Sequence, residues 1–167
     1  MSVTAIIDNT LRFNKQEDEK QDALNAAHSF NKLDLFDINI SNISLKQALH
    51  WIEHNIPTYS ASTVSFVNAH CLNVAYQDLK YKSVLTQSDI ILPDGIGVKM
   101  AARKFGTELR ANLNGTDLFP HLCKLSAKNK IPMFLLGGAE GVADKVAVVM
   151  KQRYPDLIIA GTHHGFI

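Results

Sequence analysis

The chain has 167 residues, of which 46% are hydrophobic and 20% charged, and this is enough to build one compact domain with a hydrophobic core. Its formal net charge of +1 provides no extended basic surface, so composition does not support nucleic-acid binding and we expect no nucleic-acid partner. The two cysteines lie far apart in the sequence, which argues against a disulfide framework or a zinc ribbon, and no apolar run reaches the length of about 18 residues that would predict a membrane span.

The N-terminal part is rich in Asn, Gln, Asp, Glu and Lys, and it offers little apolar surface to compensate for the entropy lost on ordering. We therefore expect a flexible polar leader over residues 1–32 and one folded domain over residues 33–167. The domain opens with an apolar run, Leu33–Ile40, that predicts a strand. Ser44 predicts the N-cap of a first helix, because Gln47 follows three residues later as in a capping box.

The rest of the domain repeats one unit: a short apolar strand, a turn of small or polar residues, and an amphipathic helix. Strands are predicted at Thr63–Val67, Asp89–Leu92, Pro132–Leu136 and Leu157–Ala160, and helices at Ala69–Thr86, Ile96–Phe105, Thr116–Asn129 and Gly141–Arg153. This pattern predicts an α/β fold, a Rossmann-like and mostly parallel sheet with helices on both faces. Ligands bind such sheets outside the carboxyl ends of the strands, so the candidate site residues are those that follow a strand.

Polar residues follow the first two strands of this repeat. Asn68 can contact a sugar hydroxyl through its amide, or it can cap the helix that follows. Asp94 can act as a general base toward an acceptor hydroxyl, or it can be an ordinary N-cap. Gly95, next in the chain, permits close approach of a ligand to the backbone. The residues alone leave each of these alternatives open.

Further candidates lie later in the chain. Gly137 and Gly138 precede a helix whose free N–H groups and dipole suit a phosphate, although glycine-rich turns also occur there for steric reasons. Arg110 can offer its planar guanidinium to a diphosphate, or it can form a surface ion pair. Thr116 and Asp117 can cap the next helix or contact a sugar, and capping is favoured.

Histidines occur in two pairs. His50 and His54 have a spacing that can bind zinc, but no third ligand or HExxH motif accompanies them, so we expect a solvated helix face. His163 and His164 follow the last predicted strand, and their relation to the site stays open.

Five segments occur in a fixed order: VNAHCLNVA, SDIILPDGIGV, LRANLNGTDLF, FLLGGAEGVADK and PDLIIAGTHHGF. Together they resemble the WecG/TagA/CpsF family of bacterial glycosyltransferases, from about residue 33 to the end of the chain. Each segment alone is a weak signal, whereas PDGIG followed by GTDL and the LLGG turn is a specific combination.

The resemblance implies an inverting enzyme that transfers an N-acetylmannosamine-type sugar, or its uronic acid. The donor would be a UDP-sugar and the acceptor an undecaprenyl-diphosphate-linked sugar, in cell-surface polysaccharide or teichoic acid biosynthesis. It also implies a cytoplasmic protein that is peripheral at the inner face of the cell membrane. Because this scheme requires no metal and the chain has no DxD triplet, we expect metal independence and no cofactor.

The resemblance places the catalytic base on Asp94. The candidate substrate-binding residues are Asn68, Arg110, Gly95, Thr116, Asp117, Gly137 and Gly138. Relative to the family, the chain is expected to lack a C-terminal segment with basic residues and membrane contact. A non-catalytic nucleotide-sugar-binding domain, an inactive truncated homologue and an interaction protein stay open as alternatives, and so does homo-oligomer formation.

Overall fold

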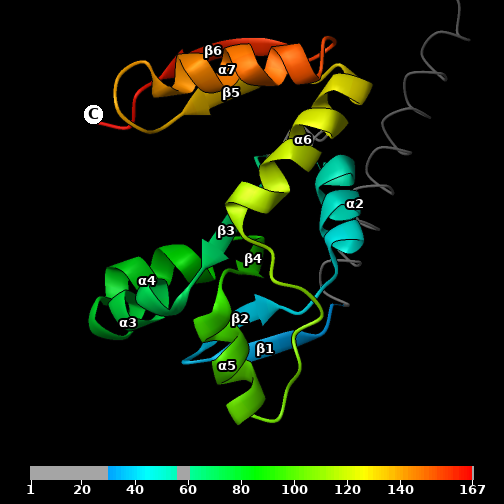
Figure 1. Cartoon of the computed structure of the whole chain (residues 1–167). Coiled ribbons are helices and arrows are strands. Elements are labelled where there is room, and N and C mark those ends of the chain that lie inside the picture. The colour runs from blue at the N-terminus through cyan, green and yellow to red at the C-terminus, as the bar shows by residue number, and fades with distance from the viewer. Residues whose placement is uncertain (1–29, 56–60, 167) are drawn as a thin grey trace, which may run out of the picture. The chain divides into compact units, whose positions relative to one another are not determined.

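The computed structural model describes residues 30–55 and 61–166 (Figure 1). Most of the expected leader, residues 1–32, lies outside the described residues. The chain divides into two compact units, Met1–Gly115 and Thr116–Ile167, and each is described by itself.

The described part of the first unit begins with a β-hairpin. Strand β1 (Lys32–Leu35) pairs antiparallel with β2 (Ile38–Ser41), and a two-residue turn joins them. Both turn residues, Phe36 and Asp37, have positive φ angles, 60° and 62°, which is the geometry of a type I′ hairpin turn. The prediction of one strand over Leu33–Ile40 was therefore wrong, because the turn divides the apolar run in two.

Helix α2 (Leu45–Asn55) follows the hairpin. Its start confirms the predicted capping box: the backbone N–H of Ser44 donates to Gln47 Oε1 at 3.0 Å, and the Gln47 N–H donates to Ser44 Oγ at 3.3 Å. These reciprocal bonds use two N–H groups that would otherwise have no partner at the helix start.

A parallel strand pair forms the centre of the first unit. Strand β3 (Val64–Val67) pairs with β4 (Ile90–Pro93), and helix α5 (Ile96–Lys104) follows β4. Between the strands the structure has two helices, α3 (Ala69–Gln77) and α4 (Leu79–Thr86), where one was predicted over Ala69–Thr86.

Asp78 causes this break. It ends α3 in an extended conformation, and its carboxylate then accepts hydrogen bonds from the backbone N–H groups of Lys80 and Tyr81 as the N-cap of α4. Aspartate favours such a cap because its side chain replaces the missing intrahelical acceptor.

The core of the first unit joins the hairpin to the parallel pair. The alternate residues of β1 and β2 that face inward are almost fully buried, and they pack with apolar side chains of β3, β4, α3, α4 and α5. The buried cluster comprises Leu33, Leu35, Ile38, Ile40, Val67, Leu72, Ala75, Leu85, Ile91, Val98, Ala102 and Leu109. Burial of this apolar surface stabilises the packing of the hairpin with β3 and β4.

The second unit also contains a parallel strand pair. Strand β5 (Met133–Leu136) pairs with β6 (Ile159–His163), and helix α7 (Val142–Arg153) connects them as in a βαβ unit. Figure 1 shows α7 lying along these two strands. Helix α6 (Gly115–Asn129) precedes β5, and it begins at the residue that ends the first unit.

The predicted α/β class with mostly parallel strands is confirmed. Two of the three strand pairs are parallel, and six helices accompany them within the described residues. The strands form three two-stranded sheets, of which the antiparallel hairpin belongs to the first unit. The parallel pairs provide the strand ends at which the candidate site residues were expected.

Candidate functional site

The strand ends of β3 and β4 lie side by side. Val67 is the register partner of Pro93, so the residues that follow, Asn68 and Asp94, leave the same edge of the pair. The backbone N–H of Asp94 donates to the Val67 carbonyl oxygen at 2.9 Å, which continues the ladder by one bond beyond the strands. This pairing brings together two candidates that are 26 positions apart in the sequence.

Asn68 is the N-cap of α3. Its side-chain Oδ1 accepts a hydrogen bond from the backbone N–H of Cys71 at 3.0 Å, and its backbone is extended with φ −107°. The capping alternative is therefore confirmed for this residue. The amide oxygen is used in the cap, and the half-buried Asn68 retains its NH₂ group as a donor for another partner.

Asp94 does not cap α5. Gly95 occupies the N-cap position, and the carboxylate of Asp94 forms no hydrogen bond or ion pair with any residue of 30–55 or 61–166. The side chain is half-buried at the strand edge. Its N-cap alternative is thus excluded, and a carboxylate without a protein partner is left beside Asn68.

Gly95 makes the turn from β4 into α5. Its φ of +91° lies in a region that side-chain-bearing residues rarely adopt, and a Cβ there would meet nothing within 4 Å. The backbone conformation, and not a lack of space, therefore favours glycine at this position. Its N–H donates to Asn112 Oδ1 at 2.5 Å, so the turn that carries Asp94 is held by a side chain 17 residues later.

Sequence reasoning missed Asn112. The residue belongs to the LRANLNGTDLF segment, but nothing near it in the sequence identifies Gly95 as its partner. The next residue, Leu113, donates its N–H to the Pro93 carbonyl oxygen at 2.8 Å, which fixes this segment beside the end of β4. Asn112 and Leu113 therefore anchor the two ends of the short stretch that contains Asp94.

Gly97 brings α5 close to α3. A Cβ on Gly97 would lie 2.7 Å from the Cβ of Ala69, the first residue of α3. Because real Cβ atoms do not approach so closely, only glycine permits this distance between the two helix starts. The helices that follow Asn68 and Asp94 are packed together at the end where the site lies.

Arg110 is placed by Asn42. The amide of Asn42 is buried, accepts from the backbone N–H of Arg110 at 2.8 Å, and donates to the Glu108 carbonyl oxygen at 2.9 Å. The guanidinium of Arg110 is exposed, and it forms no ion pair or hydrogen bond with the described residues. The surface-ion-pair alternative is thus not realised in the described part of the chain.

A pocket of about 210 Å³ adjoins Arg110. Its lining contains no carboxylate, and Arg110 is its charged member; the full lining is Phe30, Asn31, Asn42, Ile43, Gln47 and Arg110. Amide and guanidinium groups can both donate hydrogen bonds to phosphate oxygens. The pocket is chemically suited to an anionic group.

Thr116 and Asp117 lie in the first turn of α6. The helix begins at Gly115, so the position before it is Asn114. Capping of α6 by the side chain of Thr116 or Asp117 stays a prediction. Asp117 still places a negative charge in the first turn, where the helix dipole favours it.

Gly137 and Gly138 follow β5 in the second unit. They have φ angles of +146° and +74°, and the N–H of Gly137 donates to the His163 carbonyl oxygen at 3.0 Å. Gly165 packs on this turn, where its own Cβ would lie 3.2 Å from Gly137 Cα. The positive φ angles therefore favour glycine at positions 137 and 138, and the close backbone contact favours glycine at position 165. Helix α7 begins four residues after Gly138.

The histidine pairs are local contacts. The rings of His50 and His54 are 4.0 Å apart, and those of His163 and His164 are 4.3 Å apart, measured between ring centroids. Within residues 30–55 and 61–166, no three His, Cys, Asp or Glu side chains gather closely enough to hold a metal ion.

One group near the start of α3 has a shifted pKa. A hydrogen bond with Cys71 and burial raise the pKa of the Tyr81 hydroxyl above its ordinary value. Tyr81 belongs to α4 and packs against the core cluster, and it lies outside the set of strand-end residues. The raised pKa of Tyr81 therefore results from the packing of α4 against α3.

A family comparison identifies the chain at this point. The profile of the WecG/TagA/CpsF glycosyltransferases matches residues 33–167. The chain belongs to this family. The match includes every candidate site residue discussed above, and it begins where the β1–β2 hairpin begins.

Three family members illustrate the similarity, and each is an N-acetylglucosaminyldiphosphoundecaprenol N-acetyl-beta-D-mannosaminyltransferase. The Bacillus subtilis protein is 33% identical over 127 residues, which are 75% of this chain and 50% of that protein. The Bacillus spizizenii protein is 36% identical over 93 residues, 56% of this chain and 36% of that protein. A Staphylococcus aureus protein is 27% identical over 138 residues, 81% of this chain and 54% of that protein.

The chain thus spans about half the length of the Bacillus subtilis relative. No helix in the described part of the chain is long and apolar enough to cross a membrane. Of the candidate residues, the first unit contains the Asn68 amide, the Arg110 guanidinium and the Asp94 carboxylate, which has no partner among residues 30–55 and 61–166. The second unit offers the glycine turn before α7.

Proposed function

We propose that this chain carries the acceptor-activating part of a glycosyltransferase that moves an N-acetylmannosamine-type sugar, or its uronic acid, from a UDP-sugar. The acceptor would be a sugar linked to a polyprenyl diphosphate, in cell-surface polysaccharide or teichoic acid biosynthesis. Membership in the family supports the reaction class. The relatives' names, which include an N-acetylglucosaminyldiphosphoundecaprenol acceptor and an N-acetyl-beta-D-mannosaminyl product, support the substrates.

One observation carries the assignment of the base. Asp94 presents a carboxylate at the carboxyl edge of a parallel strand pair, and no described residue neutralises it or bonds to it. The other side chain at this edge, Asn68, is committed to a helix cap through its oxygen. A carboxylate with no structural partner at a ligand-binding edge is suited to accept a proton from a substrate.

In the proposed reaction, the Asp94 carboxylate accepts the proton of the acceptor hydroxyl as the hydroxyl oxygen bonds to the anomeric carbon of the donor sugar. The bond from that carbon to the UDP oxygen breaks, and UDP leaves with the electron pair. A beta-linked product from a donor with the sugar alpha-linked to UDP requires attack from the opposite face. We therefore propose inversion, with Asp94 as the single base.

The departing diphosphate requires positive charge or N–H donors. In the first unit we assign this stabilisation to the guanidinium of Arg110. In the second unit, taken by itself, the turn at Gly137 and Gly138 precedes the start of α7 and is suited to a phosphate. Each unit offers further candidate donor contacts: Gly95 through its backbone in the first, and Thr116 and Asp117 in the second. These groups supply the charge stabilisation without a metal ion, so we propose metal-independent transfer.

Replacing the base tests this function. Asp94→Asn keeps the shape of the side chain but removes proton acceptance, and we expect transfer to fall at least about 100-fold, the lower end of a typical general-base contribution. UDP-sugar binding should stay unchanged. We would measure transfer to a polyprenyl-diphosphate-linked N-acetylglucosamine acceptor with EDTA present, and donor binding by titration calorimetry.

Asp156→Asn is the matched control, because Asp156 is an exposed carboxylate in the turn after α7. The control should transfer sugar at the wild-type rate. Equal activity of Asp94→Asn and wild type would rule out the proposed base. Donor binding with no transfer by any of the proteins would instead favour a non-catalytic nucleotide-sugar-binding domain.

A further inference from the structure

Helix α5 has two large apolar side chains on its outward side. Ile96 and Met100 are 70% and 64% exposed, and they lie one helical turn apart. Phe105, directly after the helix, is 64% exposed. Tyr76, Leu79 and Val84 of the same unit are exposed to a similar degree, so the case for α5 depends on the charged residues around its apolar pair.

Basic residues border this apolar stripe on both sides. At 100° per residue, Lys99 and Arg103 lie on one side of the line through Ile96 and Met100, and Lys104 lies on the other. Arg103 has Glu108 at 3.9 Å, whereas Lys99 and Lys104 form no ion pair with residues 30–55 or 61–166. Helix α5 contains no acidic residue, so its outward side is positively charged.

The opposite side of α5 holds the helix in the fold. Val98 and Ala102 are fully buried in the core cluster, and α5 lies against β1. The outward apolar residues are therefore not needed to attach the helix to its unit. An apolar stripe between basic side chains on an otherwise anchored helix is typical of contact with an anionic membrane surface.

We propose that the outward face of α5, defined here as Ile96, Lys99, Met100, Arg103 and Lys104, binds the surface of an anionic lipid bilayer. Ile96 and Met100 would enter the interfacial region, and the basic side chains would contact lipid phosphates. An anionic lipid surface carries the charge opposite to that of this face. It can also take up the apolar side chains of α5 without offering a groove shaped for them.

This inference rests on the proposed function, and it deepens it. Helix α5 begins two residues after Asp94, at a turn held by Asn112. A bilayer at the outward face of α5 therefore lies beside the helix whose first turn adjoins the proposed base. A lipid-linked acceptor whose diphosphate is at the bilayer surface would reach Asp94 without leaving the membrane.

Vesicle sedimentation tests the proposal without any measurement of transfer. The 167-residue chain is mixed with vesicles of phosphatidylglycerol and phosphatidylethanolamine, and in parallel with vesicles of phosphatidylcholine. We expect binding to the anionic vesicles that weakens with added salt. The double variant Lys99→Gln with Lys104→Gln should lower partitioning roughly tenfold or more. Ile96→Gln with Met100→Gln should lower it as well, by removing the apolar contact.

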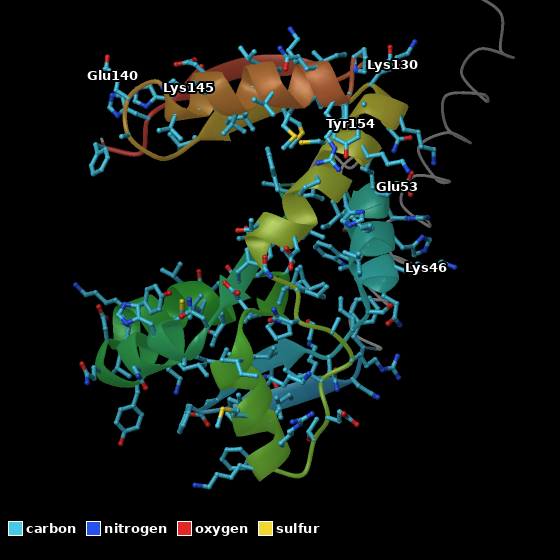
Figure 2. All side chains as sticks on the ribbon, in the orientation of Figure 1. Lys46, Glu53, Lys130, Glu140, Lys145 and Tyr154 are labelled. Carbon is cyan, nitrogen blue, oxygen red and sulfur yellow. The ribbon has the colours of Figure 1, made fainter. Side chains whose placement is uncertain are left out.

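The matched control removes the same charge elsewhere. Lys145 and Lys151 are exposed on α7, where Figure 2 labels Lys145, and Lys145→Gln with Lys151→Gln should change partitioning much less than the α5 pair. Equal losses for the two lysine pairs, or no binding of the chain to anionic vesicles, would overturn the proposal. A dimer in sedimentation velocity that the Ile96 and Met100 variant abolishes, with vesicle binding unchanged, would assign the face to a second copy and also overturn it.

Vesicle binding and transfer can fail separately. Binding that depends on α5 supports the membrane face whether or not Asp94 proves to be the base. Transfer to an acceptor with a short, water-soluble lipid that depends on Asp94, with no vesicle binding, would keep the proposed function and discard the membrane face.

Discussion

Asn68 and Asp94 follow neighbouring strands, yet their side chains have different surroundings. The Asn68 oxygen satisfies a backbone N–H at the start of α3, which is the ordinary use of asparagine before a helix. The Asp94 carboxylate satisfies none, because Gly95 takes the N-cap position of α5. Because no described residue bonds to this carboxylate, we propose that it is available for a substrate.

We propose that Asn112 positions Asp94 through the turn at Gly95. Its Oδ1 accepts the Gly95 N–H at 2.5 Å, and Asn112→Ala removes this bond while leaving the core intact. The net loss of about 1 kcal/mol for one hydrogen bond corresponds to roughly a fivefold change in an equilibrium, and we expect a fall in kcat of about that size. Steady-state kinetics with a thermal unfolding curve check this result.

Asn112→Asp provides the rescue for this test, because it keeps an acceptor oxygen at the same place. We expect it to restore most of the kcat with an unchanged KM for the donor. If Asn112→Ala lowers the unfolding temperature and leaves kcat unaltered, the residue is structural and does not position the base.

At the level of elements, turns and caps decide where helices and strands divide. The aspartates Asp37 and Asp78 interrupt segments that apolar pattern alone presents as continuous: one lies in the hairpin turn, and the other caps α4. Aspartate tolerates a left-handed backbone and bonds to nearby N–H groups, so it is suited to both places. The elements on either side still have the expected type.

The approach of α5 to α3 gives a test at this scale. Gly97→Ala would place a Cβ 2.7 Å from Ala69 Cβ, and the two helix starts would have to separate. We expect overpacking to lower the free energy of unfolding by about 1–3 kcal/mol. The higher helix propensity of alanine should offset roughly 1 kcal/mol of this loss. Urea unfolding measures the difference.

Gly115→Ala is the matched control for Gly97→Ala. Gly115 also lies at a helix start, but a Cβ there would be 3.9 Å from the Phe66 ring, an ordinary contact. The control should be neutral or slightly stabilising. If both variants have the stability of the wild type, then the contact between α3 and α5 is not tight in solution.

At the scale of the whole molecule, the two units differ in the size of their cores. The first unit contains the large buried cluster, whereas the buried apolar residues of the second are Leu118, Cys123, Ala143, Ala147 and Leu157 among those described. Stability increases with the apolar area removed from water. We therefore expect the second unit to unfold at a lower urea concentration.

The chain contains a natural probe for each unit. Trp51, the sole tryptophan of the sequence, is 4% exposed in the first unit, and its fluorescence reports unfolding there. Cys123 is fully buried in the second, and burial raises the pKa of its thiol, so alkylation near neutral pH should be slow until that unit opens. We expect Cys123 to react before the fluorescence of Trp51 changes.

Cys71 is the internal control of this experiment, because it belongs to the first unit and its alkylation can be measured in the same digest by mass spectrometry. The exposure of Cys71 should change together with the fluorescence of Trp51. Coincident transitions for all three probes would indicate a single cooperative unit and contradict the prediction.

The sequence by itself determined the types of the elements and most of their places. The strand before Asn68, the strand before Asp94, the capping box at Ser44 and the helix after the glycine turn all depend on residues within a few positions of one another. Periodicity and capping are local properties, so a single sequence contains them. The same local signals identified Asp94 as a residue with two possible uses.

Only the tertiary structure excluded the use of Asp94 as an N-cap. The bonds that hold the site turn and the Arg110 segment join Gly95 to Asn112, 17 positions later, and Arg110 to Asn42, 68 positions earlier. Burial of the shared core brings such distant groups together, and neither their spacing nor their residue types indicates the pairing. Which polar side chain is consumed by folding, and which remains for a substrate, is therefore a property of the folded chain.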